Sequence, residues 1–176
     1  MKIFRKFFEW NAARSDQRFK LFRDAKQLYL NFLEANKSYG SIEHMPPEIA
    51  KNDQNLILAE EKFRESIRLA EVESAYQDAA TSHFQLSFLY CVQGRYDEGI
   101  KELNQAIDIF NNVPNLDAAM KQTMRDCYYN IGLAGIFKKD MDIARKNLDI
   151  ALSMNKAEND REGIRLVNEA IAQIRD

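Results

Sequence analysis

The sequence predicts an all-α chain, and three observations carry that prediction. Apolar residues recur at steps of three and four along nearly the whole length, which is the spacing of one helix face. No segment shows the strict apolar–polar alternation that is typical of a strand. Only six Gly and three Pro occur among 176 residues, fewer than the turns of a strand-rich fold require.

The same spacing places the helices along the chain, with short breaks between them. Seven or eight helices are expected, over residues 1–18, 19–35, about 49–72, about 75–92, 96–110, a segment that ends near 138, about 141–154 and about 158–175. Pro46 and Pro47 interrupt the pattern because proline cannot continue a helix. Gly94 is expected to end one helix in the left-handed conformation, and Asp140 to cap the start of another.

Composition and charge fit one soluble globular domain and argue against several functions. Hydrophobic residues make up 45% of the chain and charged residues 30%, both ordinary values. The formal net charge of −2 disfavours general nucleic-acid binding. No run of about 18 apolar residues occurs, and Arg5 and Lys6 interrupt any signal-peptide core. Two widely spaced cysteines, Cys91 and Cys127, indicate a reducing compartment, so we expect a cytoplasmic protein.

An internal repeat is visible as a small residue, a large apolar residue four positions on, and a second small residue three further on. The three copies are Ala59–Phe63–Ser66, Gly99–Leu103–Ala106 and Ala144–Leu148–Ala151. Small residues let two antiparallel helices approach closely while the large residue fills the space between turns. Ser87 is therefore expected to face Gly99, and Gly132 to face Ala144. The sequence predicts a helix–turn–helix unit that is repeated three times.

Two of these units resemble the tetratricopeptide repeat (TPR). The segment 86–110 carries the signature positions as Leu86, Ser87, Tyr90, Gly94, Tyr96, Gly99, Leu103 and Ala106. The segment 125–156 carries them as Tyr128, Ile131, Gly132, Ala144, Leu148 and Ala151, with Gly135 in the place of the tyrosine. The first copy is degenerate and is split by the proline-bearing insertion. The copies stand 40 and 45 residues apart, which resembles the extended variety of a repeat whose usual length is about 34 residues.

The resemblance implies an α-solenoid, a right-handed superhelix of antiparallel helix pairs, with an added N-terminal amphipathic helix and a C-terminal capping helix. The implied domains are 1–18 for the basic N-terminal helix, 19–156 for three helix pairs (19–73, 75–111 and 115–155) and 158–176 for the cap. It also implies a concave groove that is lined by the first helix of each pair. The groove positions carried over are Thr81, Phe84, Gln85, Phe88, Val92, Asp126, Tyr129, Asn130, Leu133 and Phe137.

This groove is mostly aromatic and aliphatic, which suits an apolar peptide or the apolar face of a partner helix. The carboxylate clamp of some TPR chaperones needs Lys, Arg and Asn, whereas the matching positions here hold Gln85, Asp126 and Asn130. An acid in the place of a lysine disfavours that clamp. The alternative is that Phe84, Phe88 and other groove aromatics pack between repeats and bind no partner.

No residue pattern predicts catalysis, a cofactor or a metal, so we expect a protein that is not an enzyme. The sequence holds no glycine-rich phosphate loop and no nucleophile beside a base. His44 is expected in a solvated loop, and His83 as a packed, hydrogen-bonded core residue. The carboxylate pairs Glu60–Glu61 and Asp97–Glu98 are expected on solvated outer faces.

The N-terminal segment is basic and amphipathic. Residues 1–26 carry eight cations and three acids, so the rest of the chain sums to −7. At 100° per residue one arc collects Ile3, Phe4, Phe7, Phe8 and Trp10, opposite Lys2, Arg5, Lys6 and Glu9. Three surfaces could bury this arc: the repeats of the same chain, an anionic membrane, or a second copy of the chain in self-association. The residues expected to contact a membrane or partner are Lys2, Phe4, Arg5, Lys6, Phe7, Phe8 and Trp10.

The sequence therefore predicts a non-catalytic interaction scaffold or adaptor that binds a protein or peptide in an apolar groove. Two alternatives stay open. One is a membrane-peripheral scaffold that docks through its N-terminal helix, and the other is a small chaperone of a secretion or assembly system.

Overall fold

A computed structural model describes the backbone of residues 2–39 and 46–174, with side chains except those of residues 2–15, Tyr39 and Pro47. Within these ranges all regular structure is helical, which confirms the predicted all-α class. The helices are α1 (Lys2–Ala35), α2 (Pro47–Lys51), α3 (Gln54–Val72), α4 (Tyr76–Val92), α5 (Tyr96–Asn111), α6 (Ala118–Lys138), α7 (Met141–Ala157) and α8 (Arg161–Ala172), with a 3₁₀ turn at Lys37–Tyr39. None of the described helices is long and apolar enough to cross a membrane. The loop predicted around His44 lies outside the described residues.

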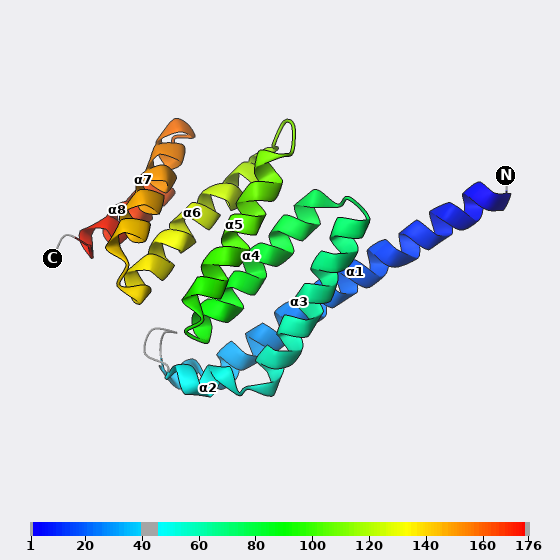
Figure 1. The fold of residues 1–176 in the computed structure, drawn as a ribbon, viewed down its shortest axis with the longest axis horizontal. Coiled ribbons are helices and arrows are strands. Elements are labelled where there is room, and N and C mark those ends of the chain that lie inside the picture. The colour runs from blue at the N-terminus through cyan, green and yellow to red at the C-terminus, as the bar shows by residue number, and fades with distance from the viewer. Residues whose placement is uncertain (1, 40–45, 175–176) are drawn as a thin grey trace.

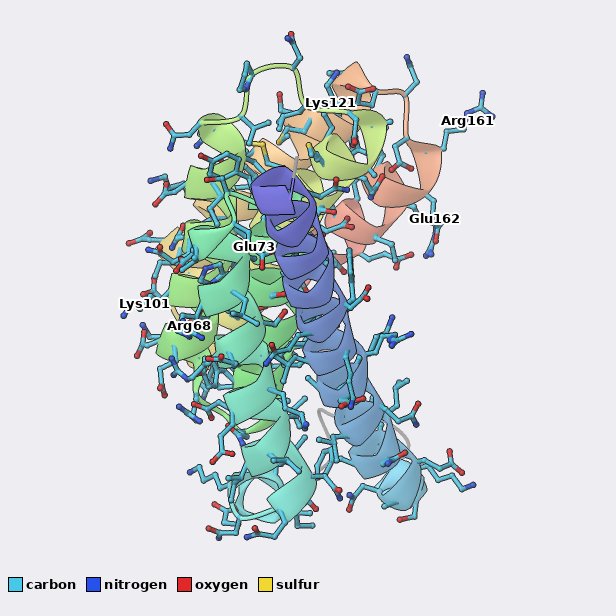
Figure 2. All side chains as sticks on the ribbon, turned by 90° about the vertical axis from the view of Figure 1, so that its right-hand side faces the viewer. Arg68, Glu73, Lys101, Lys121, Arg161 and Glu162 are labelled. Atoms are coloured by element: carbon cyan, nitrogen blue, oxygen red, sulfur yellow. The ribbon has the colours of Figure 1, made fainter. Side chains whose placement is uncertain are left out.

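The helices pack in adjacent pairs (Figure 1). α1 pairs with α3, α4 with α5 and α6 with α7, and α8 packs on α7. α4 additionally contacts both α1 and α6, so the first helices of successive pairs touch one another. Figure 2 shows α1 and α3 side by side, with Arg68 of α3 and Lys101 of α5 on one flank and Arg161 and Glu162 of α8 on the other. The second helices α3 and α5 therefore share one flank of the molecule.

One turn geometry recurs between the described helices. Positive φ angles of 54° to 71° occur at Ser74, Gly94, Lys139 and Asn159, each just after a helix. In each turn the next amide donates to the carbonyl oxygen five residues back, as Arg95 does to Tyr90 at 2.8 Å. The predicted left-handed cap at Gly94 is confirmed. The predicted N-cap Asp140 is also confirmed, because its carboxylate accepts from the Ile143 amide at 3.1 Å.

α1 is one uninterrupted helix, so the boundary predicted between residues 18 and 19 is not a break. The sequence has no Gly or Pro between Lys2 and Ala35, and nothing local stops the helix. Arg18 attaches α1 to the other helices, since its guanidinium pairs with Glu73 and, at 2.7 Å, with Asp78. The part of α1 that precedes Arg18 projects past α3 and α4 (Figure 1).

The single helix predicted over 49–72 is divided into α2 and α3. The division lies at Asp53, whose carboxylate accepts from the amides of Asn55 at 2.8 Å and Leu56 at 3.2 Å. An aspartate that satisfies these two amides starts a new helix with its own N-terminus. The apolar spacing continues through the cap, which is why periodicity alone did not show the division.

Glycines mark the places where paired helices come closest. A Cβ on Gly99 would lie 3.2 Å from the carbonyl oxygen of Ser87, so the predicted contact of these two residues is confirmed. A Cβ on Gly132 would lie 3.4 Å from the carbonyl oxygen of Ala144, which confirms the second predicted contact. At Gly135 a Cβ would lie only 2.7 Å from the backbone nitrogen of Ala144. The close approach at this point explains why the third pair has glycine where the second has a tyrosine.

Buried apolar side chains form clusters that each involve successive helices. The first cluster includes Phe32, Phe63 and Leu86, from α1, α3 and α4. The second includes Leu103 of α5 with residues of α4 and α6. The third includes Leu148 of α7 with residues of α8. Each pair is therefore supported by the helix that follows it in the chain.

The glycine contacts generate a prediction about stability. Gly135→Ala should lower the free energy of unfolding by about 1–3 kcal/mol, because the added methyl meets the immobile backbone of Ala144. Gly132→Ala is the comparison, since its methyl mainly meets the side chain of Leu148, which is buried but can shift, whereas the backbone of Ala144 cannot. Urea unfolding of both variants measures the difference. Equal losses for the two variants would contradict the close approach at Gly135.

Candidate functional site

α4 contacts α1, α3, α5 and α6, and it leaves one half-buried stripe between α1 and α6. The stripe holds four of the predicted groove residues, Thr81, Phe84, Gln85 and Phe88. Steps of three and four residues place them on one side of the helix. The fifth prediction on α4 was wrong. Val92 is 5% exposed and belongs to the core cluster that contains Ala50, because the unpredicted helix α2 adds to the core at this end of α4.

The neighbouring helix α6 carries the second part of the stripe. Asp126, Tyr129, Asn130 and Leu133 are half-buried, and Phe137 is 43% exposed. The Phe137 ring stacks on Tyr96 of α5, with 5.9 Å between the ring centroids. Since α4 and α6 are in contact, the predicted groove positions other than Val92 form one continuous surface. We call it the α4–α6 stripe.

The stripe belongs partly to the core and partly to the surface. Phe84 packs against the second core cluster, and its ring meets Phe88 edge-on with centroids 4.9 Å apart. Tyr129 and Leu133 pack against the third cluster. The predicted roles, packing between repeats and offering apolar surface, are thus combined in the same side chains. Phe88 and Phe137 are the large residues of the stripe that belong to none of the three clusters.

A small hollow of about 100 Å³ lies at the α1 end of the stripe. It is lined by Arg18 and Phe19 of α1 and by Asp78 and Thr81 of α4, among others. Arg18 is 6% exposed, and its pairing with Glu73 and Asp78 compensates the burial of its charge. The predicted residue Thr81 therefore stands at the edge of a polar junction of α1, α3 and α4.

A second hollow of about 140 Å³ lies at the α8 end of the stripe. Its walls include the predicted residues Asp126 and Tyr129 and the buried side chains of Arg125 and Asn155. Arg125 donates to Asp160 at 3.5 Å, and Asp160 also caps the start of α8. The hollow thus lies where α6, the end of α7 and the start of α8 meet.

Asp126 is electrostatically unusual in this hollow. Burial raises the pKa of its carboxyl above the ordinary value, and the hydrogen bond from Gln122 at 2.9 Å and the nearby Arg125 only partly offset that effect. Asp160 raises the pKa further. An ionised carboxylate in this position lowers the stability of the folded protein, because its charge is poorly solvated. A cationic group of a bound partner would stabilise that charge.

His83 has the predicted role of a hydrogen-bonded core residue. It is 7% exposed, and its Nδ1 lies 2.6 Å from Oε2 of Glu102 on α5. The contact joins the two helices of the second pair. Within the described residues no group of three His, Cys, Asp or Glu side chains could hold a metal ion.

Glu60 corrects one of the surface predictions. Its carboxylate accepts from the Tyr90 hydroxyl at 2.9 Å and from Arg95 at 2.8 Å, so it is not a merely solvated group. Arg95 also lies over the ring of Tyr90, 4.1 Å from its centroid. Burial alone would raise the pKa of Glu60, but the hydrogen bonds from Arg95, Tyr90 and Arg64 lower it below its ordinary value. The other predicted outer carboxylates, Glu61, Asp97 and Glu98, are exposed as expected.

Sequence reasoning missed the charged residues that border the stripe. Arg18 and Arg125 are both less than a tenth exposed, and their acidic partners are 35 to 60 residues away in sequence. No local spacing predicts such pairs. The N-terminal prediction is of a different kind, because the side chains of Lys2, Phe4, Arg5, Lys6, Phe7, Phe8 and Trp10 lie outside the described ones.

Comparison with known proteins gives no match. No family model matches the chain, no curated protein sequence matches it, and no solved structure matches it.

The raised pKa of Asp126 predicts that Asp126→Asn stabilises the fold at neutral pH. The asparagine keeps an oxygen that accepts from Gln122 and removes a charge that is penalised by burial. The gain should be present at pH 7 and disappear as the pH falls below the ordinary pKa of aspartate, where the wild-type group is neutral in both states. Thermal unfolding midpoints of both proteins across this range measure it. A midpoint at pH 7 that falls in the variant would refute the electrostatic assignment.

The lowered pKa of Glu60 predicts the opposite pH dependence. Its carboxylate stabilises the fold above the ordinary glutamate pKa, and this contribution is lost as the pH falls through the lowered folded-state pKa. Glu60→Gln should therefore be destabilised at pH 7 and approach the wild type in acid. The control is Glu61→Gln, an exposed neighbour, which should change little at either pH. Urea unfolding at both pH values gives the comparison.

Proposed function

We propose that the chain is a TPR-like α-solenoid that acts as a non-catalytic protein-interaction scaffold and binds a partner peptide or helix along the α4–α6 stripe. The observation that carries this proposal is the half-exposed, aromatic-rich stripe itself. Nine of the ten positions that the TPR resemblance assigned to a groove are half-buried or exposed, and they lie on two helices that touch. The close helix contacts at Gly99 and Gly132, two small signature positions, agree with the same resemblance.

The chemistry of the stripe favours a particular kind of partner. Toward the C-terminal ends of α4 and α6 it presents Phe88, Leu133 and Phe137, which suit apolar side chains spaced along one face of a peptide. At its α8 end lies the Asp126 carboxylate, whose ionised form would be stabilised by a cationic neighbour. We therefore expect the bound segment to place apolar residues on Phe88, Leu133 and Phe137 and a Lys or Arg toward α8.

A partner held by its C-terminal carboxylate is disfavoured. Asp126 would repel a carboxylate at the α8 end. The Asn130 amide is used within its own helix, where it donates to the backbone oxygen of Asp126 at 2.7 Å.

A reducing, cytoplasmic location agrees with the free thiols of Cys91 and Cys127.

A displayed library of random peptides tests the proposal, because it offers the stripe many different segments at once. The wild-type chain should enrich peptides with apolar residues at helical or alternating spacing and a basic residue near one end. Phe88→Ala combined with Phe137→Ala should weaken the enriched peptides at least about ten-fold, or about 1.4 kcal/mol, because it removes the large surface side chains of the stripe. Fluorescence anisotropy with a selected peptide measures the affinity.

The matched control is Leu58→Ala, which removes an apolar side chain that is 43% exposed on α3, the second helix of its pair. It should bind the peptides as the wild type does. Circular dichroism should show both variant proteins folded. A library that yields no enriched peptide, or peptides that bind the double variant as tightly as the wild type, would reject the stripe as a binding surface.

A further inference from the structure

We call residues 2–15 of α1 the overhang, because none of the other described helices lies beside it in Figure 1. Fourteen residues at 1.5 Å per residue extend about 21 Å past the point where Arg18 holds α1 to α3 and α4. Because α1 is continuous through Arg18, the overhang cannot fold back onto the α4–α6 stripe of its own chain. No other described helix of the chain covers the arc that carries its apolar residues in the sequence pattern.

The helical repeat relates the overhang to the packed part of α1. Residues seven apart are nearly two full turns apart, so Phe4, Arg18, Ala25 and Phe32 follow one side of the helix with only a slow drift. Arg18, Ala25 and Phe32 are 0–6% exposed against the other helices. By the sequence pattern, the apolar arc of the overhang thus continues the side of α1 on which α3 packs.

This side of α1 is unsuited to a bilayer. An interfacial helix lies flat and sinks its apolar face only about 5–10 Å into the lipid. α3 lies on the same side at the usual interhelical distance of about 8–10 Å, with its outer half beyond that. A membrane on the arc would therefore have to accommodate the end of α3 with its exposed Glu71.

The same side of α1 has room for one more helix in line with α3, beyond its end at Val72. We propose that this place is taken by the overhang of a second copy, so that two overhangs pair antiparallel by their apolar arcs. A parallel pair would bring two α3 helices into the same space, whereas the antiparallel pair keeps the two sets of helices at opposite ends. The proposal does not depend on what the α4–α6 stripe binds.

Charge complementarity supports the second copy. An antiparallel overlap carries the cations Lys2, Arg5 and Lys6 of one copy toward the α3–α4 turn of the other. That turn has the exposed Glu71 and the negative end of the α3 dipole. The net charge is +5 over residues 1–26 and −7 over the rest of the chain. This asymmetry also favours contact between the basic segment of one copy and the acidic remainder of the other.

The apolar surface is large enough for a stable dimer. Two overhangs together contain eight aromatic residues, which at about 150 Å² each amount to about 1,200 Å², the lower range of specific interfaces. Apolar side chains also lie exposed at the end of α3 and the start of α4, where the partner's N-terminus would arrive. Val72 is 57% exposed there and Tyr76 is 56% exposed.

Sedimentation equilibrium at micromolar concentration tests the pairing. The full chain should have about twice the 20.5 kDa mass of one copy. Phe4→Asp combined with Phe8→Asp should be monomeric and should still unfold cooperatively, because the overhang lies outside the remaining helices; its unfolding midpoint should no longer depend on protein concentration. Leu58→Asp is the control, since it replaces an exposed leucine on α3 about 21 Å from the end of that helix at Val72, and it should stay dimeric.

The antiparallel arrangement has its own test. Glu71→Lys should raise the dimer dissociation constant several-fold, because it places a cation where the partner's basic end arrives. Glu61→Lys is the matched control, an exposed glutamate about 15 Å further from the end of α3. Equal effects of the two changes would overturn the arrangement.

A monomeric wild-type chain would overturn the proposal, and so would a double variant that remains dimeric. Co-sedimentation with vesicles of phosphatidylserine and phosphatidylcholine identifies the rival occupant. If the wild-type chain is monomeric and pellets with these vesicles, and the double variant does not pellet, the apolar arc binds lipid instead.

Discussion

The close approach of the two helices within the α4–α5 and α6–α7 pairs is the constraint on which the rest of the structure depends. Gly99 lies against the backbone of Ser87, and Gly135 lies against the backbone of Ala144. Backbones at this distance leave no room for a side chain larger than hydrogen at the contact. The large residues are therefore displaced to the two sides, where Leu103 and Leu148 fill the cores toward the next helices. The α4–α6 stripe is the part of the first helices that this packing leaves half-covered.

Polar contacts fix how one pair sits on the next. The three partners Arg18, Glu73 and Asp78 tie α1 to the α3–α4 turn, and Arg95 of the α4–α5 turn reaches back to Glu60 of α3. Buried ion pairs are weak sources of net stability, but breaking one leaves an uncompensated charge. These contacts therefore oppose sliding of the pairs while the apolar clusters supply most of the favourable burial. Asp126 is the exception, since its charge is disfavoured by the fold that surrounds it.

Much of the fold could be predicted from local sequence. Helical spacing, Gly94, Asp140 and the facing small residues were sufficient to place the turns and the contacts inside the pairs. The continuity of α1 was predictable as well, since neither Gly nor Pro interrupts it, but the change in composition near residue 18 suggested a boundary. Asp53 carried a capping signal that the continuing apolar pattern obscured.

The candidate site was less accessible to sequence reasoning. The stripe positions followed from helix spacing and resemblance, and Val92 failed because α2, which was not predicted, contributes to the core at that end. The hollows at the two ends of the stripe depend on Arg18 and Arg125, whose partners come from other helices. Such contacts arise only when distant segments meet, so no spacing within one helix could show them.

Hydrogen–deuterium exchange with a peptide selected on the wild-type chain tests the central claim most directly. Exchange over minutes to hours reports local opening of each helix. Binding along the stripe predicts slower exchange in α4 and α6, with α3, α5 and the overhang of α1 unchanged. Protection confined to α3 and α5, or to the overhang, would contradict the account and move the binding surface to another part of the molecule.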